Sequence, residues 1–192
     1  MKLLVKTLGG FAILLLLHTV SNAQNRFLSG NNTDLATDLK KVLEDHPNHF
    51  KNITGELIVQ NPQSSDYQCN LKIKGAEECF ITRYAATEKE IYSWQALLLT
   101  TENFEDARKK FKSLYGQLNN LRVNSVPMKG EYENPVEEKR FTSVLLSFAT
   151  EDESMKKLKV ELIMESEGME WKVKVLVYER EREDTERGNV VE

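Results

Sequence analysis

Apolar and polar residues alternate along much of this chain, and the alternation is clearest near the C-terminus. The segments 158–165 and 170–178 both place apolar residues at every second position, and most of the residues between them are charged. This period of two puts alternate side chains on opposite faces of a sheet. With Glu167-Gly168 as a two-residue turn, the segments form a hairpin in which Met164 pairs with Trp171. A slip of one residue would bury the charged side chains, so the pattern strongly restricts the register.

The rest of the chain contains further strands and two helices. Apolar residues at helical spacing predict a helix from about residue 33 to His46 and a longer one that starts at Asn103. Pro47 disfavours helical conformation at the preceding residue and ends the first helix. Asp106 stands three residues after Asn103, which suits a capped helix start. Extended runs predict strands at 55–60, 67–73, 78–84, 91–100 and 141–150.

The order of these elements is α-β-β-β-β-α-β-β-β. Runs of consecutive strands favour antiparallel pairing, and amphipathic helices cover one face of such a sheet. We therefore predict an α+β fold, with a mainly antiparallel sheet and two amphipathic helices packed on one face. The pattern allows either one curved sheet or two smaller ones. Residues 122–140 show no clear periodicity, contain two prolines and are predicted to form a long irregular loop.

The N-terminus has the features of a secretory signal peptide. Lys2 and Lys6 precede an apolar run at 11–17, and small residues lie before a cleavage point after Ala23. The run is shorter than the ~20 apolar residues that span a bilayer, which argues against a membrane anchor. We therefore expect residues 1–23 to be removed and the protein to be exported to the periplasm or the extracellular space.

The remaining sequence divides into three parts. Residues 24–32 are polar and are predicted to be loose, residues 33–180 are predicted to form a single α+β domain, and residues 181–192 are a charged tail predicted to be disordered. A chain of 192 residues is long enough for one domain with a substantial core. Its 26 basic and 30 acidic residues give a net charge of −4, which argues against nucleic acid as a partner.

The two cysteines, Cys69 and Cys79, fall in adjacent predicted strands. A hairpin loop that ends at Gly75 and is centred on Lys74 would place them directly opposite each other. In an exported protein such a pair is expected to form a disulfide. Two cysteines at this spacing are neither a zinc site nor a C-x-x-C redox motif.

Candidate chemistry is sparse. His46 and His49 lie near Glu44 and Asp45 and are weak candidates for metal ligands, but Pro47 interrupts the helix between them. A polar helix end explains the same residues, because a histidine is favourable at the negative end of the helix dipole. The sequence contains no G-x-S-x-G, P-loop or H-E-x-x-H motif. We therefore predict no metal, no cofactor and no catalytic residue.

Three functions remain open. The first is an exported, non-enzymatic domain that binds an unidentified protein or small molecule, with Met128 and Tyr132 of the loop 122–140 as candidate contacts. The second is a hydrolase whose site is assembled from distant carboxylates or from His46 and His49. The third is a carrier of an apolar small molecule between helix and sheet. The sequence does not decide whether Asn31 and Asn52, which fit the N-glycosylation pattern, are modified.

Overall fold

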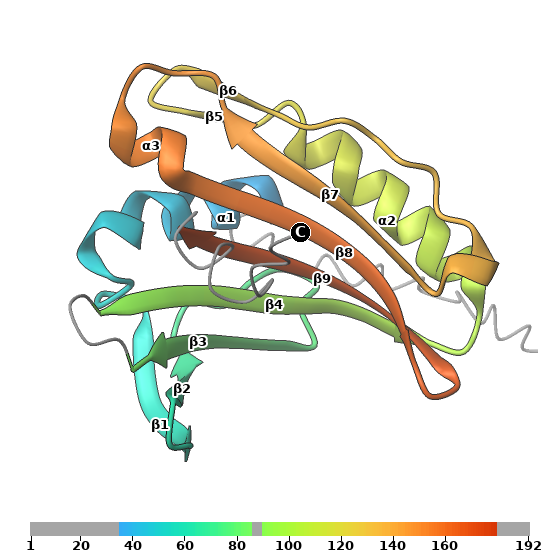
Figure 1. The fold of residues 1–192 in the computed structure, drawn as a ribbon, viewed down its shortest axis with the longest axis horizontal. Helices are drawn as coiled ribbons and strands as arrows, with labels where there is room; N and C mark the ends of the chain where they lie inside the picture. The colour runs from blue at the N-terminus through green and yellow to red at the C-terminus, as the bar shows by residue number, and fades with distance from the viewer. Residues whose placement is uncertain (1–34, 86–89, 180–192) are drawn as a thin grey trace, which may run out of the picture. The chain divides into compact units, whose positions relative to one another are not determined.

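The computed structural model describes residues 35–85 and 90–179, which form one nine-stranded antiparallel sheet with helices (Figure 1). The spatial strand order is β1-β2-β3-β4-β9-β8-β7-β6-β5, so β9 returns to pair with β4 in the middle of the sheet. The predicted α+β class is therefore confirmed, with one sheet rather than two. The predicted signal peptide, the predicted loose segment 24–32 and the whole predicted tail, 181–192, lie outside the described residues.

The strands follow the predicted order with two additions, β5 and β6. Their bounds are β1 Thr54–Gln60, β2 Ser64–Cys69, β3 Glu78–Tyr84, β4 Ile91–Thr101, β5 Arg122–Val123, β6 Val126–Lys129, β7 Phe141–Phe148, β8 Leu158–Glu167 and β9 Glu170–Glu179. The α-helices are α1 Leu35–Asp45, α2 Phe104–Leu118 and α3 Glu153–Lys157, and short 3-10 turns lie at His46–Asn48 and Glu137–Lys139. Among these helices, none is both long enough and apolar enough to cross a membrane.

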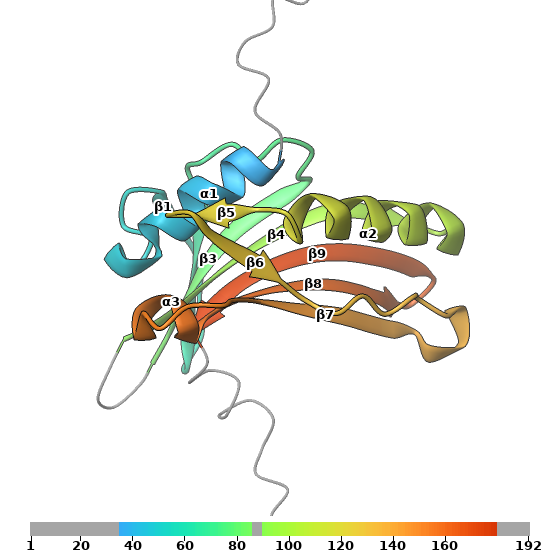
Figure 2. The same ribbon diagram turned by 90° about the horizontal axis from the view of Figure 1, so that it is seen from above.

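Helix α2 begins where the sequence predicts. The side chain of Asn103 accepts a hydrogen bond of 3.2 Å from the backbone N–H of Asp106. Its apolar stripe, which includes Phe111, is buried against the sheet. Figure 2 shows α1 and α2 on the same side of the sheet, as the sequence predicts. The two tryptophans, Trp94 and Trp171, are also buried in this core.

The hairpin of β8 and β9 has the predicted faces but not the predicted partners. Its two-residue turn is Gly168-Met169, and Met164 pairs with Val173 instead of Trp171. Gly168 has a φ of 65°, a conformation that glycine adopts without strain. The register therefore differs by two residues from the prediction. A shift of two keeps every side chain on its predicted face, so the alternation could not distinguish the two registers.

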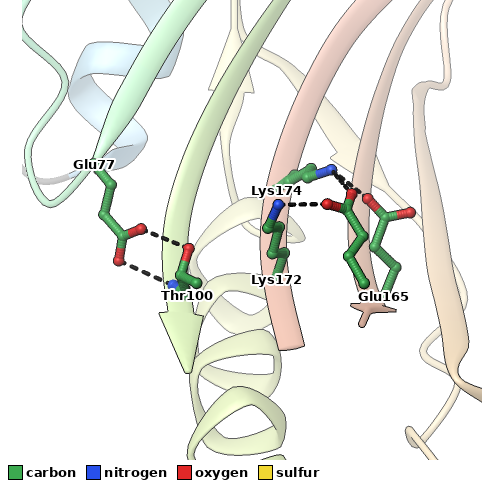
Figure 3. Close-up of polar contacts among 6 residues, drawn as sticks. Glu77, Thr100, Glu165, Lys172 and Lys174 are labelled. Atoms are coloured by element: carbon green, nitrogen blue, oxygen red, sulfur yellow. Dashed lines mark hydrogen bonds and ion pairs between the residues drawn. The ribbon is translucent and has the colours of Figure 1, made fainter. Parts of the chain in front are cut away.

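The charged side chains of this hairpin form a network on the face opposite the helices. Lys174 contacts Glu165 and lies 2.9 Å from Glu167, which also contacts Lys172 (Figure 3). Hydrogen bonds from both lysines lower the pKa of Glu167 to about 2. Burial lowers the pKa of Lys174, but its hydrogen bonds to Glu165 and Glu167 outweigh this effect, so the pKa is raised.

The segment 122–140 is more regular than predicted. Strands β5 and β6 form a small hairpin whose turn residues, Asn124 and Ser125, both have positive φ. The hairpin continues the sheet because β6 pairs with β7. The sequence pattern missed it because strands of two and four residues are too short to show a period.

The strand β2 is also displaced from its prediction, since it ends at Cys69 instead of residue 73. The next residues turn toward the N-terminal helix: the Lys74 N–H donates to Asp38 (3.1 Å), and Ile73 is buried in the core. The connection between β2 and β3 therefore spans residues 70–77, and only its left-handed residue, Gly75 with a φ of 76°, is as predicted.

Candidate functional site

The two histidines that were candidate metal ligands have different neighbours in the structure. His46 is buried, packs edge-to-face on Phe50 and has its Nε2 atom 3.8 Å from a carboxylate oxygen of Glu179. His49 lies on the ring of Tyr92, with the centroids 5.0 Å apart. Within residues 35–85 and 90–179, no three His, Cys, Asp or Glu side chains come together as metal ligands.

His46 and Glu179 line a pocket of about 470 Å³ at one end of the sheet. Its wall combines apolar residues with carboxylates from three parts of the chain. The other residues that line it are Leu43, Glu44, Pro47, Val123, Asn124, Asp152, Glu153, Ser154, Met155, Lys157 and Leu158. The hydroxyl of Ser154 is 2.6 Å from a carboxylate oxygen of Asp152, the residue that caps α3. Its hydroxyl proton is therefore committed to a local hydrogen bond.

Of the two candidate contacts, the structure buries Met128 fully and leaves Tyr132 partly exposed. Met128 is 0 % exposed and lies on β6, opposite Phe148. Tyr132 is half-buried and packs on Tyr115 of α2, with the ring centroids 4.8 Å apart. Met128 therefore offers no side-chain surface to a partner. The physical reason is that β6 joins the sheet edge and turns this methionine inward.

The space between α2 and the sheet is occupied by side chains. The residues of α2 that face the sheet are buried with those of β4, β8 and β9 in one continuous cluster. This packing is typical of a protein core. The prediction of an apolar carrier gains no supporting observation from it and stays a prediction.

The first strand, β1, carries an exposed apolar run that the sequence did not single out. Leu57, Ile58 and Val59 are 51 %, 52 % and 44 % exposed. The strand is the end of the described sheet, with β2 on one side and no described strand on the other. Glu56 is its one charged residue, so β1 lacks the lysine or proline that commonly protects a sheet edge.

A second pocket, of about 440 Å³, lies beside this edge. Ile58 lines it together with Asp66, Glu78, Cys79 and Phe80. One oxygen of the Asp66 carboxylate accepts a hydrogen bond of 2.7 Å from Thr82, which fixes the position of this negative charge. The pocket thus combines apolar side chains with two carboxylates, an arrangement suited to a long basic side chain.

The two cysteines are free thiols in this structure. Gln68 of β2 pairs with Phe80 of β3. The same register continued by one residue places Cys69 opposite Cys79, as predicted. The hydrogen bond with the Cys79 thiol is the largest cause that lowers the pKa of Cys69 to about 7, and the nearby indole of Trp94 also lowers it. The hydrogen bond with Cys69 is the largest cause of the raised pKa of Cys79, followed by burial. The predicted disulfide is thus not formed here, although its register is.

No family model, no curated protein and no solved structure matches this chain.

Proposed function

We propose that this protein is an exported, non-enzymatic binding module that receives an extended segment of a partner protein along the outer edge of β1. The observation that carries the proposal is the run of three exposed apolar residues, 57–59, on an end strand. Exposed apolar surface of this kind marks interaction sites. An end strand also presents backbone N–H and C=O groups that an added strand can satisfy.

The pocket beside Ile58 supplies specificity in this proposal. When a strand is added to a sheet, main-chain hydrogen bonds give affinity and pockets for individual side chains select the sequence. Asp66 and Glu78 give the pocket two negative charges, so the preferred segment carries an arginine or a lysine among alternating apolar residues. An ion pair at such a half-exposed position contributes about 0.2–1 kcal/mol, which is a preference rather than an absolute requirement.

The irregular pairing of β1 favours one added strand over repeated self-assembly. Two register shifts interrupt its ladder with β2, one on each side of Leu57. Such bulges twist an edge strand and oppose the flat, indefinite stacking of copies. A short segment of a partner can follow the local twist more easily than a second rigid sheet.

Labelled peptides test the proposal. Fluorescein-labelled octapeptides of alternating Val and Thr carry either one Arg or one Glu, and fluorescence anisotropy measures their binding. The Arg series should bind more tightly than the Glu series, and Ile58→Lys should weaken the Arg peptides several-fold, because it removes an apolar contact and places a positive charge at the pocket. Met169→Lys is the matched control, since Met169 is 84 % exposed at the tip of another hairpin.

Three outcomes would contradict this function. In the first, no peptide binds the protein, wherever its arginine is placed. In the second, the peptides bind Ile58→Lys as tightly as they bind the parent protein. Alternatively, sedimentation could show a dimer that Ile58→Lys dissociates, in which case the occupant of the edge is a second copy of the chain.

A hydrolase is the second candidate, favoured by the proximity of His46 and Glu179 in the 470 Å³ pocket. A carboxylate beside an imidazole can orient it and stabilise its protonated form, as a general base requires. Release of nitrophenol from a panel of nitrophenyl esters, phosphates and glycosides, compared between the parent and His46→Asn, tests this reaction class. Equal, background-level release from both proteins would eliminate it.

A further inference from the structure

We infer that Cys69 and Cys79 form a thiol–disulfide exchange site, in which Cys69 attacks an external disulfide and Cys79 completes the reaction. This assignment does not rest on peptide binding at β1, although Cys79 also lines the pocket beside Ile58. It also differs from a permanent structural disulfide, because the pair is expected to pass repeatedly between dithiol and disulfide.

The first support is the relative placement of the two sulfurs. The last pair of β2 and β3 is Gln68 with Phe80, and the same register continued by one residue sets the two cysteines opposite each other. Directly opposed residues on antiparallel strands have Cα atoms about 4.5–5.5 Å apart, within the range of a disulfide. Their Cβ atoms are usually about 4.5–5.5 Å apart, whereas a disulfide prefers about 3.8 Å. Closing the bond therefore strains the strands, and strained disulfides are the readily reduced ones.

The second support is access to solvent and asymmetry between the two residues. Both cysteines are half-buried and line a pocket of about 300 Å³ formed by residues 69–73 and 76–79. Both residues have a strand on each side, since Cys69 pairs with Thr54 of β1 and Cys79 pairs with Ala96 of β4. They differ in that Cys69 is the last residue of β2, where the chain leaves the sheet, and we assign the attacking role to this less constrained strand end.

The third support is the buried indole of Trp94. Its side chain is fully buried, and among the described residues its Nε1–H has no partner with normal hydrogen-bond geometry. The same indole helps to lower the pKa of both thiols. A buried N–H without a partner is costly. A thiolate at Cys69 would give this donor an acceptor, which favours the charged, nucleophilic form.

The reaction balances within these two residues and one external disulfide, R–S–S–R. The Cys69 thiolate attacks one sulfur, the external S–S bond breaks, and the first R–S⁻ leaves and takes up a proton. The Cys79 thiol then loses its proton to solvent and attacks the Cys69 sulfur, which releases the second R–S⁻. Two protein thiols are oxidised to a disulfide, and R–S–S–R is reduced to two thiols.

The raised pKa of Cys79 does not block the second step. Its largest cause is the hydrogen bond with Cys69, and the negative charge of Cys69 also contributes. Both of these effects end once Cys69 is bonded to the external sulfur, while burial, the second-largest cause, remains. The resolving thiol is therefore kept protonated until the mixed disulfide forms, and only then becomes easier to ionise.

Glutathione provides the probe. The folded protein is equilibrated in mixtures of reduced and oxidised glutathione, quenched with an alkylating reagent and analysed by intact mass. We expect fully reversible interconversion of dithiol and disulfide across these mixtures, with no accumulation of a mixed disulfide. Cys79→Ser should accumulate the glutathione adduct at Cys69, whereas Cys69→Ser should react more slowly.

The expected rate difference follows from the thiolate fraction. A thiol of pKa about 7 is half ionised at pH 7, against about 3 % for an ordinary cysteine, which is roughly 15-fold more thiolate. The weaker nucleophilicity of a low-pKa thiolate reduces this to about threefold. The hydroxyl introduced by Cys79→Ser can still donate a hydrogen bond to Cys69, as the Cys79 thiol does. Cys69→Ser should thus react about threefold more slowly than Cys79→Ser, with circular dichroism confirming that both variants fold.

Two results would overturn the inference. If the parent forms a disulfide that a large excess of reduced glutathione does not open in the folded state, the pair is a structural staple. If the parent remains a dithiol in oxidised glutathione, the pair has no exchange activity.

Discussion

Truncation of Met128 to alanine tests the burial that removed this residue from the candidate binding surface. Its side chain is 0 % exposed, its backbone N–H donates to Leu121 (2.9 Å), and β6 sets it opposite Phe148. Replacement of a buried methionine by alanine costs about 2–5 kcal/mol, because apolar contacts are lost and a cavity remains. Strand β6 has four residues near the sheet edge and can partly collapse, so we expect about 2–3 kcal/mol.

This loss corresponds to a clear change in melting temperature. For a domain of this size, 1 kcal/mol lowers the melting temperature by about 2–4 °C. Met128→Ala should therefore melt roughly 4–12 °C below the parent. Met169→Ala provides a matched control, because it removes the same atoms from a side chain that is 84 % exposed. Its effect should stay below about 0.5 kcal/mol.

Urea unfolding followed by tryptophan fluorescence is a suitable assay, because Trp94 and Trp171 are both buried and should report on loss of the core. The midpoint for Met128→Ala should fall without a change in the slope of the unfolding free energy. Equal stability of Met128→Ala and Met169→Ala would refute the argument. It would mean that β6 leaves the sheet in solution and that Met128 is available to a partner after all.

Three further predictions concern charge and the chain ends. The folded pKa of Glu167, about 2, is depressed, so its ion pairs stabilise the fold above its ordinary pKa near 4.5 and are lost as the pH falls toward 2. Urea unfolding at neutral and at acidic pH measures how much unfolding free energy the protein loses in acid. Glu167→Gln should reduce this loss by only a few tenths of a kcal/mol, because the side chain is half-exposed. Exported protein should begin at Gln24 by N-terminal sequencing, and an intact Met1 there would contradict the signal-peptide prediction. Truncation after Arg180 should leave the melting temperature within about 2 °C of the parent, and a larger fall would show that the tail docks.

The sequence predicted those elements whose pattern is local. The α2 helix starts at its capping residue Asn103, and β3 has its predicted bounds, since strong alternation and a cap act over a few neighbouring residues. Where two arrangements satisfy the same local pattern, the prediction failed. The hairpin of β8 and β9 is the clearest case, because registers that differ by two residues bury the same side chains.

The candidate site depended on information that no local pattern contains. The run Leu57-Ile58-Val59 resembles a buried strand in sequence, and with a neighbour on its other side it would be one. Its exposure arises because β9 returns to pair with β4, so that the four strands from β1 to β4 form one end of the sheet and β1 lies outermost. The cysteine pair shows the opposite relation. Its register was predicted, although the connection between the strands is longer than the predicted three-residue turn, but its indole neighbour, Trp94, comes from a strand that pairs with β3. Sites that depend on strand order and on cross-strand neighbours therefore form only when the whole sheet is assembled. Short catalytic motifs in the sequence do not reveal such sites.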